Sequence, residues 1–180
     1  MDTPLVVYTQ IKQQMDILKI ATDWAKEEAF SSTFFILFGL VFIAGCIGFW
    51  QLGKTDLAKA YIYPTLIAGT FLMAAGIGLY LSNKARVSSF ETEYRKDATA
   101  FVDAEIVRAD KVLKEYKNIA FTVFPLMVIV ASLLLIFMDK PLWRAISITL
   151  IATMVVIFVL DSNANARHKV YKEQLLLAKE

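Results

Sequence analysis

Four stretches without a charged residue constrain the fold of this chain more than any other feature. They hold 25, 24, 21 and 16 residues, and they cover residues 29–53, 60–83, 118–138 and 145–160. A helix needs about 20 apolar residues to cross roughly 30 Å of hydrocarbon, so the first three stretches are long enough. The fourth is shorter, but Arg144 can reach the headgroups from one end and the uncharged residues 162–166 extend the other. We therefore predict an all-α integral membrane protein with four transmembrane helices, arranged as two hairpins.

Composition agrees with this prediction and excludes other classes of protein. Hydrophobic residues make up 57% of the 180 residues, and they are concentrated in the four stretches. A soluble domain has about 45–50%. The formal net charge is only +2, which argues against a nucleic-acid partner that must be held through its phosphates. The first 28 residues contain no early apolar core, so we expect the first span to act as both targeting signal and anchor.

The distribution of Lys and Arg predicts the orientation of the chain. Residues 1–32, 83–117 and 161–180 together hold 15 of these residues, whereas the two short connections between paired spans hold 4. Positive residues accumulate on the cytoplasmic side of a membrane protein. We therefore predict an inner (plasma) membrane protein with both termini and the central connection in the cytoplasm.

The segments outside the spans also show helical patterns. Residues 1–30 form an amphipathic pattern that includes Val7, Ile11 and Trp24, so this helix either lies on the membrane surface or packs on other helices. The central connection must turn back to the membrane, which predicts a bent or hairpin-like helical stalk. Ser88 and Glu91 fit a capping box that would begin a helix there. The predicted segments are residues 1–30, 31–82, 83–117, 118–160 and 161–180.

The two halves of the chain resemble each other. The second span ends in residues 81–86 (Leu-Ser-Asn-Lys-Ala-Arg), and the fourth ends in residues 161–167 (Asp-Ser-Asn-Ala-Asn-Ala-Arg). An aromatic residue, Phe90 or Tyr171, follows four positions after each arginine. This pattern indicates either a tandem duplication of one helix-plus-hairpin unit or a short chance similarity.

Two sets of residues are candidates for special roles. Small residues spaced four apart predict tight packing of the first hairpin or a surface for self-association, and these are Ala44, Gly48, Ala74 and Gly78. Polar residues at the cytoplasmic ends of the second and fourth spans are either a binding or gating site or a set of helix caps, and these are Asp161, Asn83, Asn163 and Asn165. Pro64 and Pro125 are expected to loosen or kink the spans that contain them.

Catalytic motifs are not visible in the sequence. There is no Gly-rich phosphate loop, no nucleophile motif and no Cys/His spacing for a metal. His168, the only histidine, stands beside Arg167 and Lys169 in a basic tail, where contact with anionic headgroups is the simplest interpretation. We therefore expect a protein that is not an enzyme, without a cofactor or a metal.

Two functional interpretations remain open at this point. The four-span architecture is similar to that of some immunity proteins that neutralise membrane-acting toxins, and of small membrane components of bacterial defence systems. This similarity implies a non-enzymatic binding or accessory protein, whose partner is another protein in the membrane or at its cytoplasmic face. The alternative is a channel or pore built from several copies, although no span carries the continuous polar stripe of a lumen.

Overall fold

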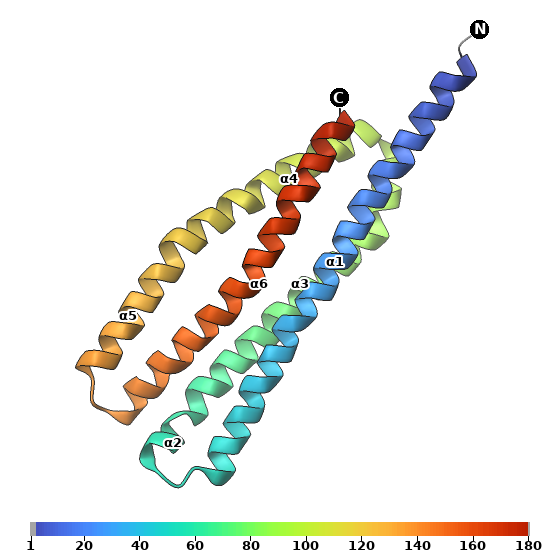
Figure 1. Cartoon of the computed structure of the whole chain (residues 1–180). Coiled ribbons are helices and arrows are strands. Elements are labelled where there is room, and N and C mark those ends of the chain that lie inside the picture. Colours follow the sequence, from blue (N-terminus) through green and yellow to red (C-terminus); the bar gives the residue numbers. More distant parts are fainter. Residues whose placement is uncertain (1–2, 180) are drawn as a thin grey trace.

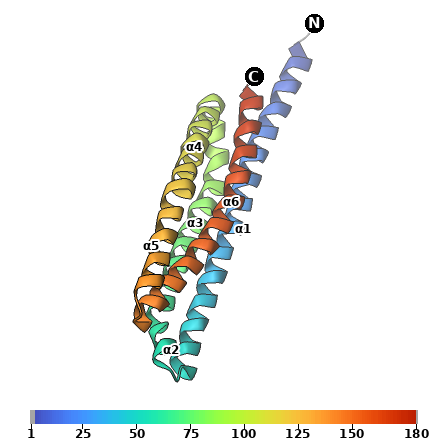
Figure 2. The same ribbon diagram turned by 60° about the vertical axis from the view of Figure 1, so that its left-hand side comes forward.

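The computed structural model describes residues 3–179, with side chains from Asp16 onward, and all secondary structure in this range is helical. Two long hairpins pack side by side (Figures 1 and 2). The first pairs α1 with α3 and the second pairs α5 with α6. The elements are α1 (Thr3–Leu52), α2 (Asp56–Ala60), α3 (Ile62–Lys96), α4 (Ala98–Asn118), a π-helical turn (Ile119–Val123), α5 (Phe124–Phe137) and α6 (Pro141–Lys179).

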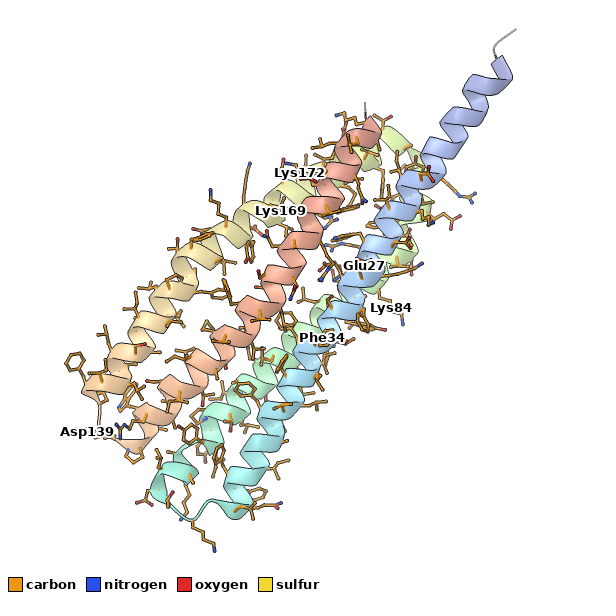
Figure 3. All side chains as sticks on the ribbon, viewed as in Figure 1. Glu27, Phe34, Lys84, Asp139, Lys169 and Lys172 are labelled. Atoms are coloured by element: carbon orange, nitrogen blue, oxygen red, sulfur yellow. The ribbon has the colours of Figure 1, made fainter. Side chains whose placement is uncertain are left out.

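Four stretches of helix are long and apolar enough to cross a membrane. This confirms the predicted all-helical fold with four membrane-crossing helices. The helices are much longer than a bilayer requires: α1 alone has 50 residues, about 75 Å at 1.5 Å per residue. The additional helical turns extend at one end of the bundle, the end toward which both termini and the α3–α4 connection lie. We call this the polar end, because Lys84, Lys169 and Lys172 lie toward it, and the opposite end, with Asp139, the turn end (Figure 3).

The amphipathic N-terminal segment is not a separate helix but the first part of α1, which runs without a break into the first span. From residue 17 onward its apolar face packs on protein. Ile17, Ala21 and Trp24 are buried in a core that also contains Phe90 and Tyr171. The side chains of Val7 and Ile11 lie outside the described residues. The described part of the segment therefore favours packing on other helices over lying on lipid.

The connection between the hairpins is itself a helical hairpin, as its length requires. The chain reverses at Asp97, whose Oδ1 accepts a 2.9 Å hydrogen bond from the backbone N–H of Ala100 and caps α4. The predicted helix start at Ser88 is wrong, because α3 continues through it to Lys96. The Ser88 hydroxyl instead donates to the carbonyl of Lys84 in the preceding turn.

The two prolines within the spans act differently. Pro125 lies two residues after the π-helical turn at Ile119–Val123, so the expected irregularity of the third span is present there. Pro64 lies in the first turn of α3, where a backbone N–H has no partner within the helix. The helix of the second span is interrupted one turn earlier, at Tyr61 between α2 and α3, so the expected irregularity lies at the start of this span and α3 itself continues without a break.

Glycine allows the closest approach of α1 and α3, but not at the predicted positions. A Cβ atom on Gly39 would lie 2.8 Å from the carbonyl oxygen of Gly69, and one on Gly76 would lie 2.8 Å from the Phe35 side chain. Nothing lies within 4 Å of such an atom on Gly48 or Gly78. Ala44 and Ala74 are also exposed on the outer surface of the hairpin. The self-association of these four residues stays a prediction.

Replacing Gly39 with alanine should therefore destabilise the first hairpin. The added methyl group would meet the backbone of α3, which cannot move aside as a flexible side chain can, so we expect Gly39→Ala to lower the free energy of unfolding by about 1–3 kcal/mol. Denaturant titration in mixed micelles measures this quantity. Gly48→Ala is the matched control and should be neutral or slightly stabilising. Equal unfolding curves for the two variants would contradict the glycine contact.

Candidate functional site

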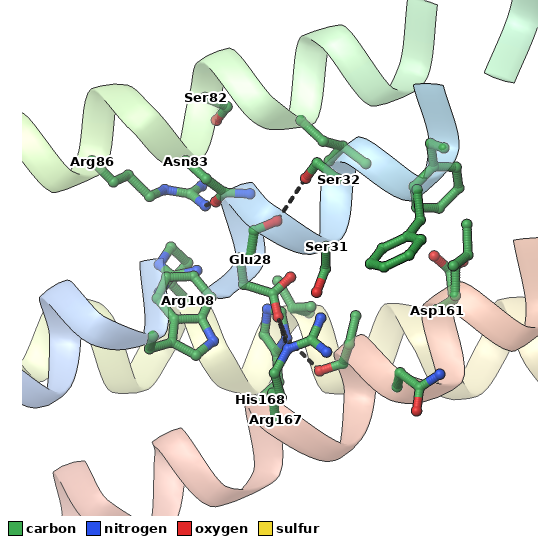
Figure 4. A pocket seen from close by; sticks show the side chains of 18 residues that line it. Glu28, Ser31, Ser32, Ser82, Asn83, Arg86, Arg108, Asp161, Arg167 and His168 are labelled. Carbon is green, nitrogen blue, oxygen red and sulfur yellow. Dashed lines mark hydrogen bonds and ion pairs between the residues drawn. The ribbon is translucent and has the colours of Figure 1, made fainter. Parts of the chain in front are cut away.

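A cavity of about 540 Å³ lies at the polar end, at the level where the charge-free stretches stop. Side chains from α1, α3, α4 and α6 line it (Figure 4). Its charged residues are Glu28, Arg86, Arg108, Asp161 and Arg167. Each of these residues lies within 10 residues of the end of a charge-free stretch, and the antiparallel packing brings them together.

Glu28 on α1 links two of the helices. Its Oε1 accepts a 2.8 Å hydrogen bond from Nε of Arg167 on α6, and the side chain is only 10% exposed. Its backbone carbonyl accepts a hydrogen bond from the Ser32 hydroxyl one turn later. A buried carboxylate needs such a partner, because desolvation would otherwise strongly disfavour its charge.

His168 lies beside this ion pair and is 7% exposed. Its Nδ1 is 2.8 Å from the carbonyl oxygen of Ala164 and 3.9 Å from Oε1 of Glu28. A carbonyl can only accept, so Nδ1 carries the hydrogen in this bond and Nε2 of the neutral ring holds a free lone pair. Burial lowers the pKa of His168 below its ordinary value, which keeps the ring neutral near pH 7. The ring is therefore suited to accept a proton at Nε2.

A stacked cluster supports the site from the side of the termini. The Trp24 ring stacks on Tyr171 with centroids 4.6 Å apart, and the Arg108 guanidinium lies 4.3 Å from the Trp24 ring centroid. Arg108 also holds both carboxylate oxygens of buried Glu105. The Tyr171 hydroxyl donates a 2.7 Å hydrogen bond to the same carboxylate. These contacts join α1, α4 and α6, so Trp24 and Arg108 have fixed positions at the cavity.

Two buried polar atoms of the cavity lining have no hydrogen-bond partner within the described residues. They are Nε1 of Trp24 and one terminal guanidinium nitrogen, Nη2, of Arg167. Both atoms are donors only. Arg86 adds further donors, since its one described hydrogen bond joins Nη1 to Oδ1 of Asn83 at 2.9 Å. The cavity therefore offers several donors to an incoming acceptor.

The structure brings most of the predicted polar residues to this place. Asn83, Asp161 and Asn163 line the cavity. Asn165 instead lines a smaller neighbouring cavity of about 180 Å³, which shares Asp161 and His168 with the larger one. A binding role for these four residues stays a prediction.

Sequence reasoning found Asp161 but missed the other charged members of the site. Glu28 was expected only as part of the amphipathic N-terminal helix, Arg86 and Arg108 as parts of the helical connection, and Arg167 and His168 as residues of a basic tail. The available signal was their shared position just beyond the spans. It is a weak signal, because the residues belong to four helices and form no local motif.

The comparisons with known proteins identify the family. Residues 23–177 match the family model described as heparan-alpha-glucosaminide N-acetyltransferase, catalytic. This range includes all four spans and every cavity residue named above. No curated protein and no solved structure matches the chain.

This match overturns the earlier functional interpretation. The family is one of acetyltransferases, so the expectation of a protein that is not an enzyme is wrong. The interpretations as a non-enzymatic binding or immunity-type protein and as a channel fail with it. The titratable groups of the candidate site lie just beyond the spans on different helices, so they form no motif along the sequence. The chain belongs to the heparan-alpha-glucosaminide N-acetyltransferase catalytic family.

Proposed function

We propose that this chain is a membrane-bound N-acetyltransferase and that the polar-end cavity is its reaction site. The observation that carries the proposal is buried His168, whose Nδ1 is held by the Ala164 carbonyl at 2.8 Å so that Nε2 is free as a base. Membership of an acetyltransferase family supplies the class of reaction. The cavity volume of about 540 Å³ is within the range of small-molecule sites.

The proposed reaction transfers an acetyl group from an activated ester or thioester donor to a primary amine. The amine nitrogen attacks the acetyl carbonyl carbon, and the bond from that carbon to the donor's oxygen or sulfur breaks. His168 Nε2 takes a proton from the attacking nitrogen and returns it to the departing oxygen or sulfur. The products are an amide and a free alcohol or thiol, so atoms and charges balance without an oxidant or reductant.

The donors in the cavity suit the charge that develops during this reaction. Attack places negative charge on the acetyl oxygen, and fixed donors aimed at such an oxygen lower the barrier. Arg167 Nη2 and Trp24 Nε1 are buried and have no partner in the described part of the chain. Arg167 is held by Glu28, and Trp24 by its stack on Tyr171, so neither needs to reorganise as the charge appears.

Replacing His168 with asparagine tests the role of the base. The asparagine amide can still donate to the Ala164 carbonyl but has no basic nitrogen, so we expect His168→Asn to fold normally and to lose about 10²–10⁴-fold in kcat. The assay is transfer of isotope-labelled acetyl to a primary amine by protein reconstituted in liposomes, with the acceptor that the wild-type protein acetylates fastest. Lys169→Gln, an exposed change at the next residue, is the control and should retain full activity. Unchanged turnover in His168→Asn would exclude the base.

The pH dependence of the reaction should follow the same residue. The neutral ring is the active form, and burial places the pKa of His168 below its ordinary value of 6.5. We therefore expect kcat/KM, expressed per concentration of neutral amine, to be level near pH 7 and to fall about tenfold per unit once the pH drops below this pKa. Steady-state rates from pH 5 to 8 measure the profile. A profile that already falls between pH 8 and 7 would require another base.

The orientation of the chain belongs to the same proposal. The excess of Lys and Arg supports a cytoplasmic polar end in the plasma membrane, with the site open to cytoplasmic donors. In a Cys46→Ala background, a single cysteine at Asp139 should react with an impermeant maleimide in intact cells. A single cysteine at Lys179 should react only after permeabilisation. The reverse labelling pattern would invert the orientation.

A further inference from the structure

The polar-end cavity lies across the boundary between the charge-free spans and the charged helix ends. Phe34, Phe35 and Leu79 line it from within the charge-free stretches, whereas Glu28 and Arg86 line it from beyond them. Phe34 and Leu79 are 39% and 45% exposed, so neighbouring helices do not seal the apolar side of the cavity. In a membrane this side faces lipid. A molecule with an apolar part could therefore enter from the bilayer.

The charged side of the cavity offers places for groups of both signs. Glu28 uses only Oε1 in its hydrogen bond with Arg167, and the Asp161 carboxylate has no hydrogen bond or ion pair among the described residues. Both carboxylates can hold an ammonium group. The unpartnered donors, Arg167 Nη2 and Trp24 Nε1, together with Arg86, can hold an anion.

We propose that the amine acceptor is an aminophospholipid, a lipid whose headgroup carries a primary amine beside a phosphate. This inference rests on the proposed acetyl transfer and names its acceptor. The phosphate would lie against Arg86 and Arg167, the ammonium would lie between Glu28 and Asp161, and the acyl chains would pass Phe34 and Leu79 into the bilayer. A free amino sugar has neither the phosphate nor the apolar part that these surfaces fit.

The chemistry of an amine acceptor also explains why a base, His168, lies beside the carboxylates of Glu28 and Asp161. The lipid ammonium first loses a proton to solvent, and the neutral amine then reacts by the balanced transfer described above, with His168 taking the second proton. The product is an amide without positive charge. It no longer interacts with Glu28 and Asp161 as a cation, which favours its release into the membrane.

Lipid retention tests the binding without any acetyl donor. Purified protein is reconstituted in vesicles of phosphatidylethanolamine, phosphatidylcholine and phosphatidylglycerol in equal parts, extracted in mild detergent, and examined by native mass spectrometry. We expect phosphatidylethanolamine to be retained at least fivefold over the other two, since choline is bulky and glycerol carries no amine. Equal retention of the three lipids would overturn the inference.

Matched variants locate the binding in the cavity. Arg86→Gln and Asp161→Asn each remove one charged contact and should lower the retention ratio of phosphatidylethanolamine over the other lipids to about one. Arg95→Gln, whose side chain is 76% exposed and pairs with Glu91, and Asp139→Asn at the turn end should leave it unchanged. Circular dichroism and gel filtration check that all four variants fold. Loss of retention in the control variants as well, or in none of the four, would overturn the assignment to this cavity.

Acetylation assays separate this inference from the proposed function. With a labelled donor, wild-type protein should convert phosphatidylethanolamine to its N-acetyl form. Its N,N-dimethyl analogue should be retained but should not form an amide. Acetylation of glucosamine but not of the lipid would overturn the inference and leave the proposed function standing. Selective retention of the lipid without acetyl transfer to any amine would overturn the proposed function and the acceptor role together.

Discussion

The high free energy of a charged group in hydrocarbon is the constraint on which this structure depends. It keeps charges out of residues 29–53 and the three later stretches, and so fixes how deeply each helix sits in the membrane. Because paired helices run antiparallel, their charged ends gather at the same level. Charged residues near the span ends, such as Glu28 on α1 and Arg167 on α6, are therefore brought together from different helices. The candidate site is a direct consequence of this geometry, since it forms where the bilayer first permits charge.

The polar end is held together by a different kind of packing from the spans. In the first hairpin, glycines such as Gly39 let the backbones of α1 and α3 approach closely. Beyond the spans, aromatic and charged side chains hold the helices together. Trp24 stacks on Tyr171, and the Arg108 guanidinium lies 4.3 Å from the Trp24 ring centroid and 5.9 Å from that of Tyr171. The Tyr171 hydroxyl donates to Glu105, and burial raises the pKa of this phenol, so it remains a donor. A network with all these partners present is rigid, which gives the cavity walls fixed positions.

The sequence sufficed for the number of spans, their pairing and the hairpin connection, because hydropathy and length alone determine them. The helix start predicted at Ser88 is wrong, since α3 continues to Lys96 and the next helix begins after Asp97. A capping box is a local pattern, and it does not by itself interrupt a long helix. The packing glycines were also misassigned, since Gly39 and Gly48 differ only in which side of α1 meets α3.

Asn83 and Asp161 were found as polar residues at the ends of spans. The acid–base group was missed, because Glu28 and His168 are 140 positions apart and only the fold brings them together.

The similarity between the two halves of the chain allows corresponding residues at the cavity to be compared. In the proposed repeat, Arg86 corresponds to Arg167 and Phe90 to Tyr171, and the structure places both arginines on one cavity. Their surroundings differ, because Arg167 binds Glu28 whereas Arg86 binds only the amide of Asn83. His168 has no counterpart in the first half, where Val87 follows the arginine. A symmetric pair of arginines would explain affinity for an anion but not catalysis. In the proposed reaction, the asymmetry supplied by Glu28 and His168 gives this cavity one cationic side for recognition and one basic side for proton transfer.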